Sequence, residues 1–482
     1  MDTVVFRRSA VLLLPYLLLF AFTRSNALFY DTTQFAGEVP NWYYFNDFRY
    51  FLLPDHCDSG HPPGFGLYLA LMWKMFGRTL EVSHAAMLPF LCLNVYQTVR
   101  MSILLFPGQR RNAWGLSILL LAQTPLLAQS TLVSPDIIVY GAGIWMLNAI
   151  WKRTSVSLAF AVLLVALVSI RGMSVAVCMF LIKWWYDHAK DGRPVLQTGL
   201  KALIPFLPGG ITGLLYLAYH YIHKGWITPT PDTPWGYAFE RVGGMQLLKH
   251  QAVLLWRILD IGNILSVWVA VLLIVFYLFK RKLLVVGEGQ DLKLRSMLLV
   301  LVLLFICTAW PLTLYQGLLT QRYLLFFTTI LITVGYCLLV RWRIRETGKL
   351  ALWAAMLAVQ LSGSYWIYPS TLSLSWDCTL AHLPYYDLRR EFLQYMEQEG
   401  IDRSAVVTEF PMQKPGTVID YTSDTLRYTP LNETDPEKVT LLWYSNVCNG
   451  LLKKKDYFEA NFTKLKYEKR GRVEMILYRR KP

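Results

Sequence analysis

The sequence predicts a polytopic α-helical membrane protein of about eleven transmembrane helices, followed by a small C-terminal α/β domain. Hydrophobic residues make up 55% of the 482 residues, charged residues make up only 16%, and the mean hydropathy is +0.35. A soluble domain carries about 25% charged residues, so lipid is expected to surround most of this chain. The other two observations are a series of apolar runs of near-spanning length and a polar tail beyond residue 369.

The basic residues are unevenly distributed along the chain, which has a formal net charge of +15. Residues 370–482 are almost neutral, with 17 basic and 16 acidic side chains, whereas the first 369 residues hold 30 basic and 16 acidic ones. The excess lies between apolar runs, where orientation in a bilayer explains it better than a nucleic-acid patch does. Nucleic-acid binding is therefore excluded as the main function.

The apolar runs define the predicted spans, because a helix that crosses a bilayer needs ~20 predominantly apolar residues. The first run follows Arg7 and Arg8 and is expected to stay in place as an uncleaved signal anchor. The predicted spans are Ser9–Thr23, Val82–Leu105, Ala113–Gln129, Asp136–Trp151, Ser155–Ile170, Gly172–Tyr186, Leu200–Ile222, Ile261–Phe279, Ser296–Tyr315, Tyr323–Val340 and Leu350–Tyr368.

A further apolar run, Gly64–Phe76, decides the predicted topology. It has only 13 residues and contains Lys74, which would sit deep in hydrocarbon if the run crossed the membrane. We expect it to lie in the interface, with Lys74 at the headgroups and with Leu69, Met72 and Trp73 facing the acyl chains. This choice places 19 of the 30 basic residues on the cytoplasmic side, as the positive-inside rule requires.

The same topology predicts where the polar segments lie. The N-terminus is cytoplasmic, and the transmembrane domain spans residues 1–369. Its long outer loops, 24–81 and 223–260, and the soluble domain at residues 370–482 all lie on the extracytoplasmic side. A bacterial inner membrane is the expected location.

The C-terminal domain is expected to be a small α/β unit. Tyr386–Gln398 has helical spacing, Ala405–Glu409 and Val439–Tyr444 are typical of strands, and Lys464–Arg480 is typical of a hairpin that turns at Gly471.

Cysteines are too few for a disulfide scaffold, with seven in the chain. Cys378 and Cys448 both lie in the predicted outer domain, so a disulfide between them is left open.

The first outer loop holds the most unusual polar residues. Asp31 comes just after the first span. An acidic side chain at the level of the membrane is energetically costly and tends to be kept for function. The alternative is that Asp31 is an ordinary solvated acid in a loop. The segment Asp55–His61 has enough donors for a divalent metal, but its spacing matches no defined zinc motif. A metal is left open, and no nucleotide or protease motif is evident.

Three short motifs give the chain a family resemblance. Asp31 is followed by an aromatic-rich loop and by His61-Pro62-Pro63, Ser134-Pro135-Asp136 opens a span, and Arg322-Tyr323-Leu324-Leu325 opens the tenth span. This pattern resembles the GT-C membrane glycosyltransferases, and most closely their aminoarabinose-transferase and protein O-mannosyltransferase branch. The chain departs from it at Thr32, where the family has a second acid, and His61 is similar to the mannosyltransferase form.

The resemblance implies a GT-C-like fold and an integral-membrane glycosyltransferase of the cell envelope. Such an enzyme moves a sugar from a polyprenyl-phosphate donor to a lipid, glycan or protein acceptor on the extracytoplasmic side. Asp31 would be the catalytic base and Asp136 a second catalytic carboxylate. The residues expected to bind substrate are His61, Arg171, Arg241, Arg322, Tyr323 and Tyr237, with Arg257 as a further outer-side cation. For Arg171, a simple role in breaking a helical hairpin is the alternative.

Two other classes of function remain as rivals. A multi-span transporter or lipid flippase would typically show internal repeats and ionisable residues at the midplane. Here the spans are largely free of midplane charge and polar residues gather at one face, which favours chemistry at the membrane surface. A scaffold subunit without catalysis would fit if Thr32 marks lost activity.

Overall fold

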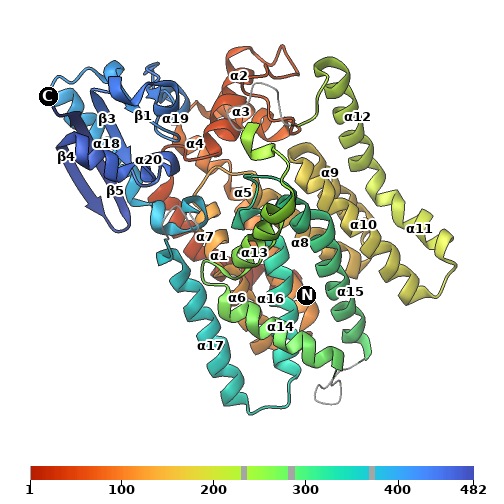
Figure 1. The fold of residues 1–482 in the computed structure, drawn as a ribbon. Coiled ribbons are helices and arrows are strands. Elements are labelled where there is room, and N and C mark those ends of the chain that lie inside the picture. Colours follow the sequence, from red (N-terminus) through yellow and green to blue (C-terminus); the bar gives the residue numbers. More distant parts are fainter. Residues whose placement is uncertain (1, 229–235, 280–287, 368–374) are drawn as a thin grey trace.

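The computed structural model describes residues 2–228, 236–279, 288–367 and 375–482. A bundle of long helices carries a small mixed sheet at one end (Figure 1). The predicted domain boundary at 369/370 lies outside the described residues, as do the basic residues Lys280, Arg281 and Lys282.

The bundle is built from helices that are apolar over most of their surface. Its members are α1 (Asp2–Thr23), α5 (Leu88–Leu105), α6 (Arg110–Leu121), α8 (Asp136–Lys152), α9 (Ser155–Val168), α10 (Ile170–Asp191), α11 (Val195–Leu203), α12 (Leu207–Lys224), α14 (Ile264–Phe279), α15 (Glu288–Leu304), α16 (Leu325–Arg341) and α17 (Glu346–Ser362). Helix α16 is central, because every side chain from Leu325 to Leu339 is buried. Elsewhere large apolar side chains face outward, as Leu272 and Phe279 do on α14, so the chain is an integral membrane protein.

Length and composition allow five helical segments of the described chain to cross a membrane. They are Thr3–Thr23, Leu80–Leu105, Val195–Lys224, Asp291–Leu314 and Gln321–Arg341. A sixth span exists if α13 (Gly244–Leu259) and α14 count as one, although they are bent by 103°. The predicted count of eleven spans is therefore not confirmed.

One predicted span, Ala113–Gln129, is broken into α6 and α7 (Thr124–Ser130). Pro125 stands in the first turn of α7, where its missing N–H needs no helical partner. The side-chain amide of Gln123 donates to the carbonyl of Leu120 and to the hydroxyl of Thr329 at the break. The second segment directs Gln129 toward the polar end of the bundle.

Helix α3 (Gly64–Phe76) has the predicted bounds but a different orientation. Leu69 and Trp73 are buried against protein, so the prediction that they face acyl chains is wrong. Trp73 packs edge-on against Tyr421 of the C-terminal region, at 4.8 Å between ring centroids, and its indole donates to Ser83. The exposed apolar face is formed by Leu71, Met75 and Phe76 instead. The interfacial placement of α3 stays a prediction.

The C-terminal region contains α18 (Pro384–Gln398) and a five-stranded sheet. The strand order is β2 (Thr429–Pro430), β1 (Val406–Thr408), β3 (Leu441–Ser445), β5 (Val473–Arg480) and β4 (Phe462–Arg470). Strand β1 is parallel to β2 and β3, and β3, β5 and β4 are antiparallel. The predicted helix, strands and hairpin are all present, and Gly471 turns the hairpin with a φ of +55°.

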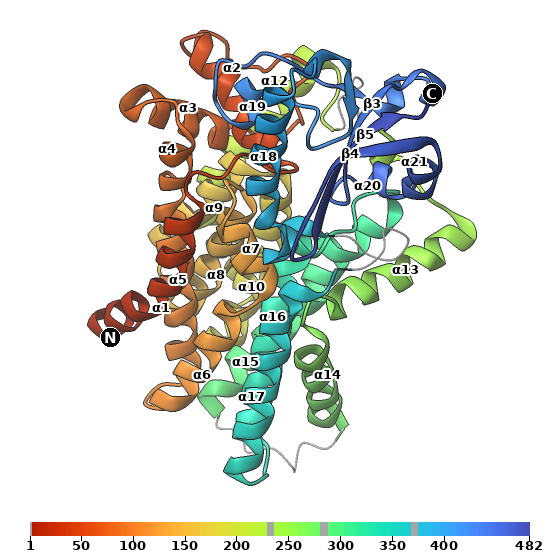
Figure 2. The same ribbon diagram turned by 90° about the vertical axis from the view of Figure 1, so that its left-hand side faces the viewer.

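The sheet and the first outer loop share one hydrophobic core. Phe29, which is fully buried, packs against Tyr385 and stacks on His382 at 5.3 Å. The amide of Leu28 donates to the carbonyl of Ile419, and the guanidinium of Arg78 donates to the carbonyl of Tyr421. The loop and the sheet therefore lie at the same end of the bundle, as both views show (Figures 1 and 2).

All seven cysteines are free. The sulfur of Cys378 lies 3.8 Å from the hydroxyl of Thr320, whereas that of Cys448 lies 3.6 Å from the carbonyl of Glu409. The disulfide that the sequence left open is not formed.

Candidate functional site

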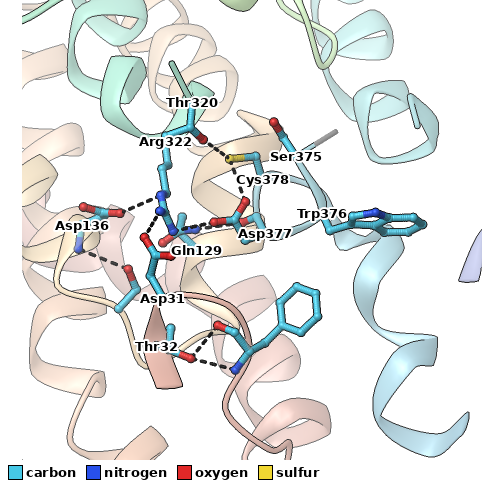
Figure 3. Close-up of polar contacts among 12 residues, drawn as sticks. Asp31, Thr32, Gln129, Asp136, Thr320, Arg322, Ser375, Trp376, Asp377 and Cys378 are labelled. Carbon is cyan, nitrogen blue, oxygen red and sulfur yellow. Dashed lines mark hydrogen bonds and ion pairs between the residues drawn. The ribbon is translucent and has the colours of Figure 1, made fainter. Parts of the chain in front are cut away.

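Arg322 is the centre of a cluster of charged side chains at the polar end of the bundle (Figure 3). It lies in the short helix Gln321–Leu324 that leads into α16, and its side chain is 9% exposed. One terminal nitrogen is paired with Asp31, and the other lies 2.5 Å from a carboxylate oxygen of Asp377. Its Nε is 3.5 Å from Asp136. Three aspartates from distant parts of the chain thus surround one guanidinium.

Asp31 is held by a tight turn that follows α1. The hydroxyl of Thr32 accepts the amide of Phe29 and donates to the carbonyl of the same residue, both at 2.8 Å. Tyr30 adopts a φ of +53° in this turn, and its hydroxyl donates to the carbonyl of Val447. Thr32 is buried, so its side chain has a structural role here. Asp31 itself remains 34% exposed.

Asp136 also forms an ion pair with Arg171, at 2.6 Å. Asp136 opens α8, and its amide donates to the hydroxyl of Ser134. Arg171 lies in the first turn of α10, just after the break from α9, so it does stand at a hairpin turn. Its guanidinium also stacks on the ring of Tyr323, 3.6 Å from the centroid. Arg171 therefore does more than break a helix.

Asp377 is the member of the cluster that sequence reasoning missed. It lies in the short helix Trp376–Cys378, and the side-chain amide of Gln129 donates to its carbonyl at 2.8 Å. Burial raises the pKa of Asp377, as do the charges of Asp31 and Asp136, while Arg322 acts against them. A signal existed in the sequence, because Asp377 follows the last apolar run much as Asp31 follows the first.

We define the aspartate–arginine cluster as Asp31, Asp136, Arg171, Arg322 and Asp377. With all five groups ionised, its formal charge is −1. Asp31 is the carboxylate a substrate can reach, since the side chains of Asp136 and Asp377 are each only 8% exposed.

His61 lies beside the cluster. Its Nδ1 accepts the amide of Ile170 at 3.4 Å, and its carbonyl accepts the hydroxyl of Tyr216. Burial and the charge of Arg171 lower the pKa of His61 to about 4, and the charge of Asp136 acts in the opposite direction. This lowered pKa favours the neutral ring at neutral pH. The role of His61 in binding substrate stays a prediction.

The remaining predicted residues lie at the edge of the site or outside it. Tyr237 has a partly exposed side chain. Its pKa is raised by partial burial and by the charges of Asp31 and Glu409, so it lies near the cluster. Arg257 donates to Gln321 and to Ser375 next to Asp377. Arg241 has an exposed side chain, and its backbone pairs with Tyr315. The structure therefore does not bring Arg241 into the cluster.

The residues proposed for a metal are engaged elsewhere. Asp55 pairs with Lys224, and Asp58 pairs with the buried His220 at 3.0 Å. In the described ranges of the chain, no group of three or more histidine, cysteine, aspartate or glutamate side chains is arranged to hold a metal ion. The three clustered aspartates already surround the cation of Arg322.

No family model and no curated protein sequence matches the chain. Among solved structures, the chain is similar to the crystal structure of ArnT from Cupriavidus metallidurans bound to undecaprenyl phosphate. The similarity covers 97% of each chain, with a TM-score of 0.49 and 10% sequence identity.

Proposed function

We propose that this protein is a membrane glycosyltransferase that moves a sugar from a polyprenyl-phosphate donor to an acceptor hydroxyl. The observation that carries this proposal is the pair of guanidinium groups, Arg322 and Arg171, held among three aspartates at the end of an apolar bundle. This arrangement offers a phosphate site, a base and a lipid-facing surface within one region.

The two arginines are suited to the donor phosphate. A guanidinium binds phosphate through two parallel N–H donors, as it binds carboxylate. Arg171 and Arg322 lie on the same ring, that of Tyr323, at 3.6 and 5.0 Å from its centroid. A phosphate that displaces Asp31 from Arg322 would meet both cations. It would leave as polyprenyl phosphate, and the cations stabilise the charge that develops on it.

Asp31 is the base in this proposal. Removed from Arg322 by the phosphate, its carboxylate accepts the proton of the acceptor hydroxyl. The acceptor oxygen attacks the anomeric carbon from the face opposite the phosphate, the bond from that carbon to the phosphate oxygen breaks, and the configuration inverts. Asp136 and Asp377 keep the arginines in place.

The sugar, the acceptor and the side of the membrane belong to the proposal as well. The charged loops and the sheet lie at one end of the bundle, which we assign to the extracytoplasmic side. Tyr237, exposed near Asp31, is placed to stack on a sugar ring. A lipid, a glycan and a protein all remain possible acceptors.

The test is donor consumption by the purified full-length protein in detergent. The protein is incubated with a panel of polyprenyl-phosphate sugars, and released polyprenyl phosphate is measured by mass spectrometry with and without candidate acceptors. We expect release from one member of the panel with the wild type and none with Asp31→Asn. No release from any donor would contradict the proposal. Lipid movement across proteoliposomes that Asp31→Asn leaves unchanged would favour the flippase instead.

A further inference from the structure

A cavity lies at the end of the bundle opposite the aspartate–arginine cluster. It has a volume of about 420 Å³, is lined by α6, α16 and α17, and is open on one side. Its lining includes Arg111, Trp114, Ile118, Tyr336, Lys349 and Trp353.

Helix α16 connects the two sites and sets their separation. Arg322 lies just before the first turn of α16, and Leu339 lines the cavity near its last turn. At 1.5 Å per residue, the two positions are roughly 25 Å apart along the helix axis. That distance is close to the ~30 Å thickness of a bilayer's hydrocarbon core. The cavity is therefore separate from the proposed active site and belongs to the other membrane surface.

The lining of the cavity changes from polar to apolar along its helices. On α6, Arg111 and Asn112 are followed by Trp114 and Ile118. Helix α17 shows the same order, from Lys349 to Trp353. Each change takes place within about 10 Å of helix. A ligand that fits this gradient has a charged head and an apolar chain.

The polar rim carries an excess of positive charge. Arg111 is exposed, and its charge acts on the nearby Glu346. Lys349 donates to the carbonyl of Val340 and pairs at 2.8 Å with Glu346, the rim's one acidic group among the described lining residues. Arg8 of α1 adds a further cation, 5.7 Å from the ring of Trp114. The rim thus favours an anionic head over a zwitterionic one.

The aromatic side chains that line the cavity are fixed by contacts between the helices. A side chain at Gly115 would put its Cβ 2.3 Å from the hydroxyl of Tyr336, so glycine allows α6 and α16 to approach here. The indole of Trp353 donates to the carbonyl of Gly115 at 3.0 Å, which fixes α17 against α6. Tyr336 is also held edge-on by Phe106. A ligand entering the cavity finds a shaped aromatic surface.

We propose that this cavity binds an anionic phospholipid. The phosphate head lies at the rim against Arg111 and Lys349, and the first carbons of the chains lie against Trp114, Ile118 and Trp353. The bound lipid joins α6, α16 and α17 at the end of the bundle farthest from the sheet.

The experiment uses delipidated full-length protein in detergent and follows its thermal unfolding. Phosphatidylglycerol, phosphatidylcholine or inorganic phosphate is titrated in separate series. We expect phosphatidylglycerol to raise the midpoint by at least about 3 °C at saturation, and the other two to have little effect. Arg111→Gln should weaken the apparent affinity for phosphatidylglycerol about fivefold, because one basic residue near an anionic lipid contributes ~1 kcal/mol.

Lys190→Gln is the matched control, since Lys190 is an exposed basic residue at the far end of α10 and lies outside the cavity. Its affinity for phosphatidylglycerol should equal that of the wild type. Leu350→Trp, at a half-exposed lining position, should fill the cavity and abolish the response without lowering the lipid-free midpoint. Equal shifts with phosphatidylcholine, an equal shift with inorganic phosphate, or identical behaviour of Arg111→Gln and Lys190→Gln would each overturn the proposal.

Discussion

A terminal nitrogen of Arg322 lies 2.5 Å from a carboxylate oxygen of Asp377, although Asp377 comes 55 residues later in the chain. The other terminal nitrogen of the same guanidinium is paired with Asp31, which comes 291 residues earlier. Arg322 therefore joins the end of the first helix to the segment that leads into the sheet. The site depends on three parts of the chain that only the folded protein brings together.

Replacing Asp31 with asparagine should abolish sugar transfer and leave thermal stability near that of wild type. The substitution keeps the size of the side chain but removes the proposed base, a loss that typically costs 10²–10⁴-fold in rate. The rate at which polyprenyl phosphate is released under single-turnover conditions measures this loss. Turnover within about threefold of wild type would remove Asp31 from this role.

Asp377→Asn should lower kcat on the order of 10²-fold, because Arg322 then loses one of the charges that fix its orientation. Asp387→Asn is the matched control, since Asp387 is exposed and pairs only with Arg390 among the ion pairs of the described chain. Steady-state kinetics with the identified donor distinguish the two variants. Equal rates for both would show that the contact between Asp377 and Arg322 does not support transfer.

Arg322→Ala should impair donor use far more than Arg257→Ala does. Arg322 is ion-paired with all three aspartates of the cluster, whereas Arg257 donates to Gln321 and Ser375 at its edge. Arg322→Lys should not restore activity, because the ammonium of lysine lacks the planar pair of parallel N–H donors with which a guanidinium binds phosphate. The KM for the donor and kcat are measured for all three. Similar small losses would place the phosphate elsewhere, with Arg171 as the next candidate.

Acidification should destabilise the protein through His61 and His382. Burial lowers the pKa of each ring to about 4, below the usual value of 6.5. Between these values the unfolded chain binds more protons, so stability is lost as the pH falls from about 6.5 toward 4. Each histidine should lower the free energy of unfolding by about 2 kcal/mol at pH 5 relative to pH 7.

The difference in unfolding free energy between pH 7 and pH 5 tests this in wild type and in His382→Gln. The variant loses the hydrogen bond to the carbonyl of Thr379 at both pH values, so only the difference is informative. If His382→Gln shows the same difference between pH 7 and pH 5 as the wild type, the protonation of His382 does not contribute to the loss of stability.

The topology is testable with two single cysteines in a cysteine-free variant. Thr347, in the first turn of α17, and Thr429, on β2, are both exposed and lie at opposite ends of the molecule (Figure 1). On intact cells, a membrane-impermeant thiol reagent should label only the cysteine at position 429. Labelling at 347 alone would place the sheet and the aspartate–arginine cluster on the cytoplasmic side.

Much of the architecture follows from local pattern. The bounds of α3 and the hairpin that turns at Gly471 were predictable, because hydrophobic periodicity and a glycine turn are properties of a short segment. The orientation of α3 was not, since the burial of Leu69 and Trp73 depends on Tyr421, more than 300 residues away. The break at Gln123 was missed because its polar amide is satisfied by Thr329 in another helix.

The residues of the candidate site also differ in how far the sequence could predict them. Asp31, Asp136 and Arg322 could be predicted because each stands at a helix end within a short motif. Asp377 carries no such motif, and its place in the cluster arises from contacts with Gln129 and Arg322. The lowered pKa of His61 could not be predicted, because it follows from burial that the sequence does not show.

The position of Asp377 bears on how the protein is made. During synthesis, the first helix and the residues around Arg322 leave the ribosome before the strands of the sheet do. The segment that carries Asp377 joins the core of the sheet through Trp376, and that core includes Tyr478, which comes about a hundred residues later in the chain. We therefore expect the cluster to close only after β5 has been made, so that a nascent chain that lacks this strand holds no finished site.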